Sequence, residues 1–221
     1  RRLPFLALVV ALSLPLAFAA QRSNAFVYGS GGMHSPESPL KLEQKALEER
    51  FGPGRMMLVM VPEGDLVREA RLAEALARLP GVDSLTSYAA TVGVQVPPDL
   101  LPQAARDQFS EGGYSRLILS VNTPDEGEEA FLLVEEVRAL AESYYPGAAH
   151  TLGESVVNLD LKTVITGDNL PVLLAGIIAI GLVLLIYFQN LLIPLVLLLV
   201  IEGAIWINMA LPFIMGASMN Y

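Results

Sequence analysis

The chain is 221 residues long and 53% hydrophobic, with a formal net charge of −9 and no cysteine. Residues 22–168 hold 22 of the 23 acidic and 12 of the 14 basic residues, so a middle part with a net charge of −10 lies between two apolar ends. This acidity argues against nucleic acid as a partner, and the absence of cysteine excludes disulfides and thiolate metal sites.

Residues 1–21 predict a first transmembrane helix. Arg1 and Arg2 precede an uncharged apolar run at 3–20, which is long enough for a slightly tilted span. The sequence Ala-Phe-Ala at 17–19 also resembles the cleavage site of a signal peptide, but the apolar run is long for one. We therefore favour an uncleaved signal-anchor. The two arginines favour a cytoplasmic N-terminus, which puts residues 22–168 outside the cytoplasm.

The exported part begins with a polar, glycine-rich connector at 21–33. A helix is expected at 38–51, where a serine N-cap and a first-turn proline precede apolar residues on one face. Residues 56–61 are almost wholly apolar, which is typical of a strand covered on both faces. A second helix is expected at 65–79, capped by its first residue, an aspartate.

Two further strands are expected at 82–87 and 114–121, the second with clear apolar alternation. Thr123 and Glu126 then have the spacing of a capping box, with a proline in the first turn. The helix that follows is expected to bury residues spaced by three and four: Ala130, Val134, Val137, Ala141 and Tyr144.

A last strand is expected at 148–152 and an amphipathic helix at 154–168, which carries Val157, Leu161 and Val164 on one side. The order strand-helix-strand, insert, strand-helix-strand predicts a ferredoxin-like α+β sandwich with both helices on one face of the sheet. The expected fold class is therefore membrane α-helical plus α+β, with the α+β domain at residues 22–168.

Two more transmembrane helices are expected at 169–189 and 190–221. Residues 170–188 carry no charge and reach about 28 Å as a helix, close to the thickness of the hydrocarbon core of a bilayer. A short polar break at 189–190 separates them from a second apolar run, so the pair is typical of a transmembrane hairpin. A buried helix pair in a soluble core is the alternative, but charge-free runs of this length are rare there.

Motifs for catalysis, cofactor binding or metal binding are not legible, so no enzyme activity and no cofactor is expected. His34 and His150 lie far apart without the spacing of a metal site. The paired glutamates at 128–129 and 135–136 suit a solvated helix face. The glycines at 29–32 lack the lysine and the preceding strand of a phosphate-binding loop.

Two features are candidate functional sites. The insert at 88–96, which contains Tyr88, Val92, Val94 and Val96, is too apolar for a free loop. It either packs on its own domain or faces a ligand, a partner subunit or the outer leaflet. Glu202 lies in the middle of the third span, where a carboxylate needs a protein or water partner. It either belongs to a transport pathway or, protonated or paired with Trp206 or Asn208, holds helices together.

The layout of one span, an exported α+β domain and then a span pair resembles the first part of resistance-nodulation-division (RND) transporters. The amino-acid sequence itself resembles their MMPL-like branch more closely, over nearly the whole chain. The segments that carry this resemblance are Phe51-Gly52, residues 57–62, Leu79 to Val82, Tyr114-Ser115-Arg116, Gly153-Glu154-Ser155 with Asp160, and Ile201 to Asn208.

The resemblance implies a proton-driven exporter of lipids or other hydrophobic or amphiphilic cargo in the cell membrane, with the exported domain as a porter module. Its partners would be this cargo, the lipid bilayer, the remaining spans of a longer protein and further copies in a homo-oligomer. The family's proton-relay acids lie in later spans, so no residue here is assigned that role. The alternatives are an accessory motor of Sec-type protein translocation and a membrane-anchored sensor or binding module.

Overall fold

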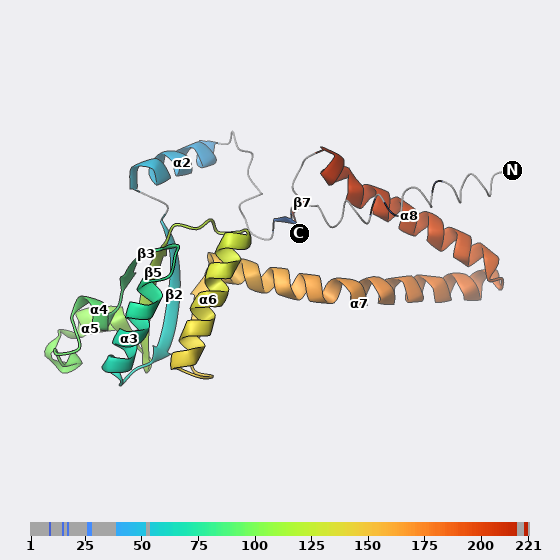
Figure 1. The fold of residues 1–221 in the computed structure, drawn as a ribbon. Helices are drawn as coiled ribbons and strands as arrows, with labels where there is room; N and C mark the ends of the chain where they lie inside the picture. Colours follow the sequence, from blue (N-terminus) through green and yellow to red (C-terminus); the bar gives the residue numbers. More distant parts are fainter. Residues whose placement is uncertain are drawn as a thin grey trace. The chain divides into compact units, whose positions relative to one another are not determined.

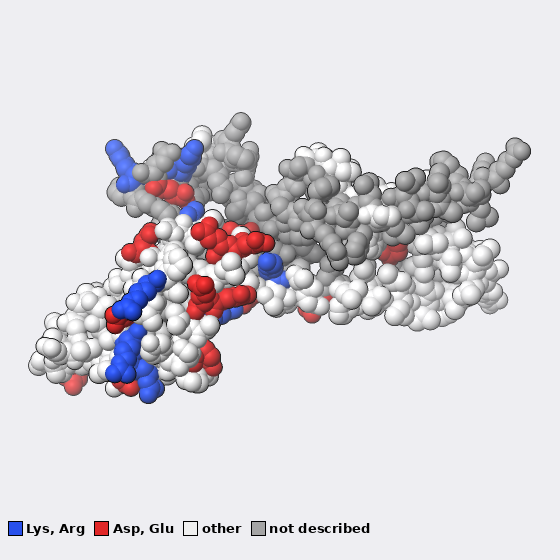
Figure 2. Space-filling model, in the orientation of Figure 1, with Lys and Arg blue, Asp and Glu red and all other residues white. Residues whose placement is uncertain are grey.

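The computed structural model describes residues 9, 15, 17, 26–27, 39–51, 54–215 and 219–220. The chain divides into two compact units: residues 34–161 form an α+β domain, and residues 1–33 with 162–221 form a unit of mainly apolar helices (Figure 1). Most of the predicted first span and connector, including Gly29–Gly32 and His34, lies outside the described residues. Charged side chains gather over the domain in Figure 2.

The domain is built on an antiparallel sheet with the strand order β3-β5-β2-β6. At its centre, β2 (Arg55–Pro62) pairs with β5 (Tyr114–Val121) along the whole length of both strands. β3 (Val82–Thr86) lies outside β5, and β6 (His150–Gly153) lies outside β2. The short strand β4 (Ser110–Glu111) also pairs with β5. All four strands of the main path were predicted to within about two residues at each end.

Within the described residues, helices cover only one face of this sheet. Because side chains alternate along a strand, the register of β2 and β5 places six apolar side chains on the same face. On the other face Met56 is 66% exposed, and Leu58 and Met60 are only half-buried. The prediction that residues 56–61 are covered on both faces is wrong, because both helices that pack on the sheet lie on one side. The buried six are Met57, Val59, Val61, Leu117, Leu119 and Val121.

Helices α3 (Leu66–Ala77) and α6 (Glu128–Tyr144) close the core over that face. The side chain of Asp65 accepts a hydrogen bond from the backbone N–H of Arg68 at 2.9 Å, which confirms the predicted cap of α3. The apolar stripe of α6 was also predicted correctly at most positions. Its buried residues are Ala130, Phe131, Leu133, Val134, Val137 and Ala141.

The start and the end of α6 differ from the prediction. The helix begins at Glu128 after Gly127, whose φ of +117° lies in the region that favours glycine, and Thr123 does not cap it. Thr123 is buried instead, and its hydroxyl has no hydrogen-bond partner among the described residues. The chain uses the intervening residues to pass from the sheet layer to the helix layer. At the other end Tyr145 is buried, whereas Tyr144 is only half-buried.

Helix α2 (Pro39–Phe51) begins at the predicted proline, and Leu42 and Leu47 on it are exposed. The insert between β3 and β5 contains three short helices: α4 (Tyr88–Thr91), the 3₁₀ turn η2 (Pro98–Leu100) and α5 (Gln103–Phe109).

Helix α7 (Glu154–Phe188) contains both the predicted amphipathic helix and the following apolar segment without a break. Within the described residues it is the one helix long and apolar enough to cross a membrane. Helix α8 (Leu192–Met215) follows, with a shorter apolar stretch over Leu192–Asn208. The unit also contains the short parallel pair β1 (Phe26–Val27) and β7 (Met219–Asn220).

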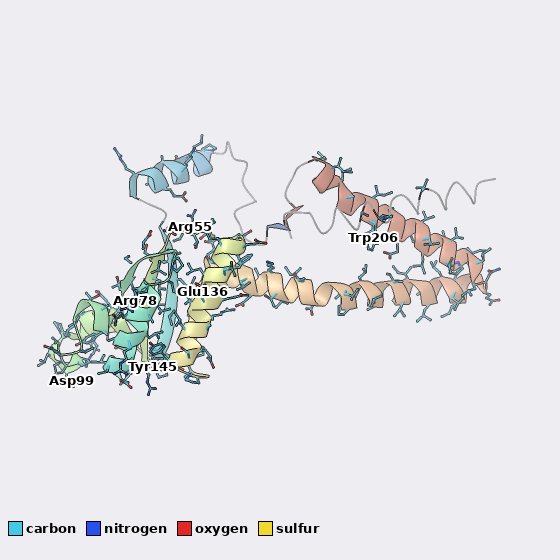
Figure 3. The ribbon with its side chains drawn as sticks, viewed as in Figure 1. Arg55, Arg78, Asp99, Glu136, Tyr145 and Trp206 are labelled. Atoms are coloured by element: carbon cyan, nitrogen blue, oxygen red, sulfur yellow. The ribbon has the colours of Figure 1, made fainter. Side chains whose placement is uncertain are left out.

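Replacing Val134 by aspartate is expected to unfold the domain, because the side chain is fully buried and an unpaired charge there costs several kcal/mol. Glu136→Ala on the exposed side of the same helix (Figure 3) should change the free energy of unfolding by about 0.5 kcal/mol or less. Thermal loss of the domain's protease resistance measures both variants. Equal sensitivity would contradict the packing of α6.

Candidate functional site

The predicted apolar insert packs partly on its own domain. Tyr88 is buried, and its hydroxyl donates a hydrogen bond to the backbone oxygen of Val96 at 2.7 Å. Its ring meets that of Phe109 edge-on, with 5.9 Å between the centroids. Val92 is half-buried at the end of α4, and Val94 remains 42% exposed. Tyr88 and Val96 are therefore brought together, whereas Val94 lies at the surface.

Next to this insert lies a pocket of about 510 Å³, and Tyr88 is the one predicted site residue that lines it. Four carboxylates and one arginine contribute to its wall, which makes the wall acidic. The lining residues are Glu63, Gly64, Leu66, Tyr88, Pro98, Asp99, Arg106, Asp107, Ser110, Glu111, Gly112, Gly113 and Ser115. Within the described parts of the chain, no cluster of three His, Asp or Glu residues could hold a metal ion.

Glu202 and Asn208 both lie on α8, but no hydrogen bond joins them. One carboxylate oxygen of Glu202, Oε2, is buried and has no hydrogen-bond partner among the described residues, whereas Asn208 is exposed. One turn beyond Glu202, Trp206 packs against Ala17 and Ala210, both of which are buried. Trp206 lies on α8 in Figure 3. This contact brings part of the N-terminal apolar run against α8.

The start of α7 is held firmly by the domain. Gly153 ends β6 with a φ of +150°, and a Cβ there would lie 3.1 Å from the backbone oxygen of Met56. Glycine is therefore needed where the strand turns into the helix. Val156 and Leu159 belong to the domain core, whereas the predicted apolar side of Val157, Leu161 and Val164 is exposed. The two buried residues attach the helix to the core by its opposite side.

Polar contacts add to this attachment. Arg138 on α6 donates two hydrogen bonds to the carboxylate of Asp160 on α7, both at 2.8 Å. The buried side chain of Asn158 donates to the backbone oxygen of Asp125 at 3.1 Å. The Asp125 carboxylate accepts a hydrogen bond from Nε of Arg55, at the start of β2, at 3.2 Å. We call Arg138, Asp160, Asn158, Asp125 and Arg55 the α7 anchor.

Within the anchor, Arg138 and Asp160 each shift the pKa of the other. The hydrogen bonds from Arg138 lower the pKa of Asp160 below its ordinary value, and those to Asp160 raise the pKa of Arg138. Elsewhere in the domain, burial raises the pKa of Tyr145 to about 12, and Arg68 lies over its ring. Tyr145 is near one end of α6 beside α3 (Figure 3), so it is separate from the pair that joins α6 to α7.

Beyond the anchor, α7 contains Pro171. Proline has no backbone N–H, so the carbonyl of Gly167, four residues earlier, loses its usual hydrogen bond inside the helix. The change falls between the polar and the apolar parts of α7.

Sequence reasoning did not find the anchor. Arg138 lies on the polar face of a helix and Asp160 lies 22 residues later, so only the packing of α7 on α6 brings them together. The available signal was Asp160, which is among the residues that carry the family resemblance. Asn158 is buried, but its burial is not visible in the sequence.

Comparison with known families places the chain. The model of the MMPL family matches residues 36–217, which includes the domain, α7 and α8. The chain belongs to the MMPL family, a family of membrane transporters of the RND type. It is therefore part of a membrane protein. A search of curated proteins found no match.

Removing the charged pair of the anchor is expected to destabilise the domain modestly. Asp160→Asn and Arg138→Gln should each cost about 1 kcal/mol or less, because the two side chains remain 56% and 37% exposed. The double variant should cost little more than either single variant. The pKa of Asp160 is lowered in the folded state, so this stabilisation is present at neutral pH and is lost as the pH falls below about 4.

Thermal unfolding of the detergent-solubilised protein at several pH values measures these effects. Glu74→Gln, which breaks the more exposed pair of Glu74 with Arg78 on α3, is the matched control and should cost about 0.3–0.5 kcal/mol. Additive costs for Asp160→Asn and Arg138→Gln would show that the two side chains do not act as a pair.

Proposed function

We propose that this chain supplies the N-terminal part of a proton-driven MMPL-type exporter of lipids or other hydrophobic and amphiphilic compounds. The observation that carries the proposal is helix α7, which joins the core of a folded α+β domain to a long apolar segment in a chain of this family. The exported domain would contact cargo, and α7 would carry its movement into the membrane.

We assign the domain to the ferredoxin-like, porter-type class. The antiparallel strand order β3-β5-β2-β6 supports this, because the first and third strands of a split βαβ arrangement lie in the centre of the sheet. The two crossing helices, α3 and α6, share the core on one face. The insert with its acidic pocket interrupts the pattern between the second and third main strands.

We also propose three spans, at 1–21, 169–189 and 190–221, with the domain at 22–168 outside the cytoplasm. The hydropathy of α7, the apolar stretch of α8 and the contact of Ala17 with Trp206 and Ala210 support this. Among the described helices, α7 meets by itself the length and composition expected of a span.

Transmission from domain to membrane follows from the anchor. Val156 and Leu159 are buried in the domain core, and Asp160 and Asn158 are hydrogen-bonded to α6 and to the loop after β5. A helix held by both apolar and polar contacts must follow a displacement of the domain. Loss of the anchor would therefore weaken this attachment, while Val156 and Leu159 would still hold the helix on the core.

A cysteine at exposed position 129 should react with an impermeant thiol reagent in intact cells, and a cysteine at position 189 should react only after lysis. The expected pattern follows from a cytoplasmic Arg1-Arg2 and an odd number of crossings before the domain. Labelling of both positions in intact cells, or of neither, would contradict the three-span topology.

Cells that express the full-length protein are expected to retain less of a lipophilic fluorescent dye or lipid analogue than cells without it. Collapse of the proton gradient should remove the difference, and retention of the difference would contradict proton coupling.

If Glu202 belongs to the pathway, Glu202→Gln should reach the membrane in normal amounts but export poorly, because the variant keeps the shape of the side chain and loses its ionisable group.

Two further variants test the alternative: Glu202→Leu tests a role in helix packing, and Leu199→Ile is the matched control. Poor accumulation of the leucine variant with normal export by the glutamine variant would assign Glu202 to helix packing instead. Leu199→Ile, an apolar exchange on the same helix, should leave both accumulation and export unchanged. Parental behaviour of all three variants would remove Glu202 from both roles.

A further inference from the structure

The two edges of the sheet are protected differently. On β3 the pairing with β5 is shifted between Val82 and Ser84, and the carboxylate of Asp83 accepts a hydrogen bond from Asn122 at 2.9 Å. A bulge and a charge are common devices that prevent a strand from pairing with another chain. The opposite edge, β6, has the sequence His-Thr-Leu-Gly and carries neither an acidic residue nor a lysine or arginine. Among the described strands, none pairs with its outer side.

An open groove of about 800 Å³ follows this edge. On the helix side it is bordered by α6, where small side chains leave room for a backbone. On the sheet side it is bordered by Leu152, which is 46% exposed, and by Met60. The lining residues are Met60, Arg138, Ala139, Ala141, Glu142, Ala149, His150, Thr151 and Leu152. A strand added here would find apolar surface on both sides, as its alternating side chains require.

We propose that β6 pairs with the β6 of a second copy of this chain, antiparallel about a two-fold axis. Such an interface is isologous, so the same patch must be complementary to itself. Arg138 and Glu142 have opposite charges, lie one helical turn apart and flank Ala139 in the groove. A two-fold axis that passes near this small residue places each arginine of one copy near the glutamate of the other.

Both charged side chains keep capacity for this contact. Asp160 accepts hydrogen bonds from two nitrogens of Arg138, and a guanidinium has five N–H groups. The backbone N–H of Gly147 donates to Oε1 of Glu142 at 2.8 Å, which leaves the second carboxylate oxygen for the partner. The acidity of the domain opposes association, but at physiological ionic strength salt largely screens the repulsion between exposed charges more than about 8 Å apart.

Single cysteines at positions 150, 151 and 152 test the pairing in the full-length protein, in membranes and in a cysteine-free background. Residues directly opposite each other in an antiparallel pair lie about 4.5–5.5 Å apart, within reach of a disulfide or a short bismaleimide. At least one of the three variants is expected to form a covalent dimer of this chain. A cysteine at position 84, exposed on the opposite edge, is the matched control and should stay monomeric.

A second experiment combines Leu152→Lys with the cysteine variant that crosslinks best, and it tests whether the crosslink depends on pairing of the two β6 strands. The substitution places two like charges next to each other across the two-fold axis, so crosslinking should be lost while membrane accumulation and protease resistance of the domain stay unchanged. No crosslink at any of the three positions would overturn the proposal. Equal crosslinking at position 84, or crosslinking that persists with Leu152→Lys, would do the same, because either result indicates random collision.

Discussion

The pairing of β2 with β5 is the constraint on which the rest of the domain depends. Eight consecutive residues of each strand are opposed without a shift, so the alternation of one strand is locked to that of the other. A slip by one residue would turn every buried side chain of one strand to the uncovered face. The helices α3 and α6 and the first turns of α7 all pack on the single apolar face that this register creates. The attachment of α7 to the domain therefore depends on the hydrogen-bond register of two strands.

Much of the domain could be predicted because its signals are local. Asp65 before an apolar stripe marks the start of α3, and the alternation at 114–121 marks β5 with its correct bounds. Thr123 shows where local reasoning fails. Its spacing to Glu126 suits a capping box, but the residue is buried in the structure and the helix begins later, at Glu128. Its methyl group lies close to Gly81, and that packing is not visible in the sequence.

The candidate site could be predicted only in part, for a related reason. Glu202 was singled out because a carboxylate in an apolar run is conspicuous by itself, and its role stays a prediction. The α7 anchor consists of ordinary polar residues, and it exists only because α6, α7 and the loop after β5 meet. Which face of a sheet stays open is likewise decided by tertiary packing. A continuous apolar run at 56–61 suggested cover on both sides, whereas half of its side chains face away from the helices.

Gly167 and Pro171 make α7 easier to bend at one turn, although the helix is continuous from Glu154 to Phe188. A helix resists bending because its hydrogen bonds are evenly spaced along the axis, and one of them is missing here. The helix is stiff on either side of this point, so bending concentrates in a single turn between the charged segment and the apolar segment. α7 therefore consists of two rigid helical segments with one hinge between them. A change of angle at this turn would leave the shape of the helix on either side of it unchanged.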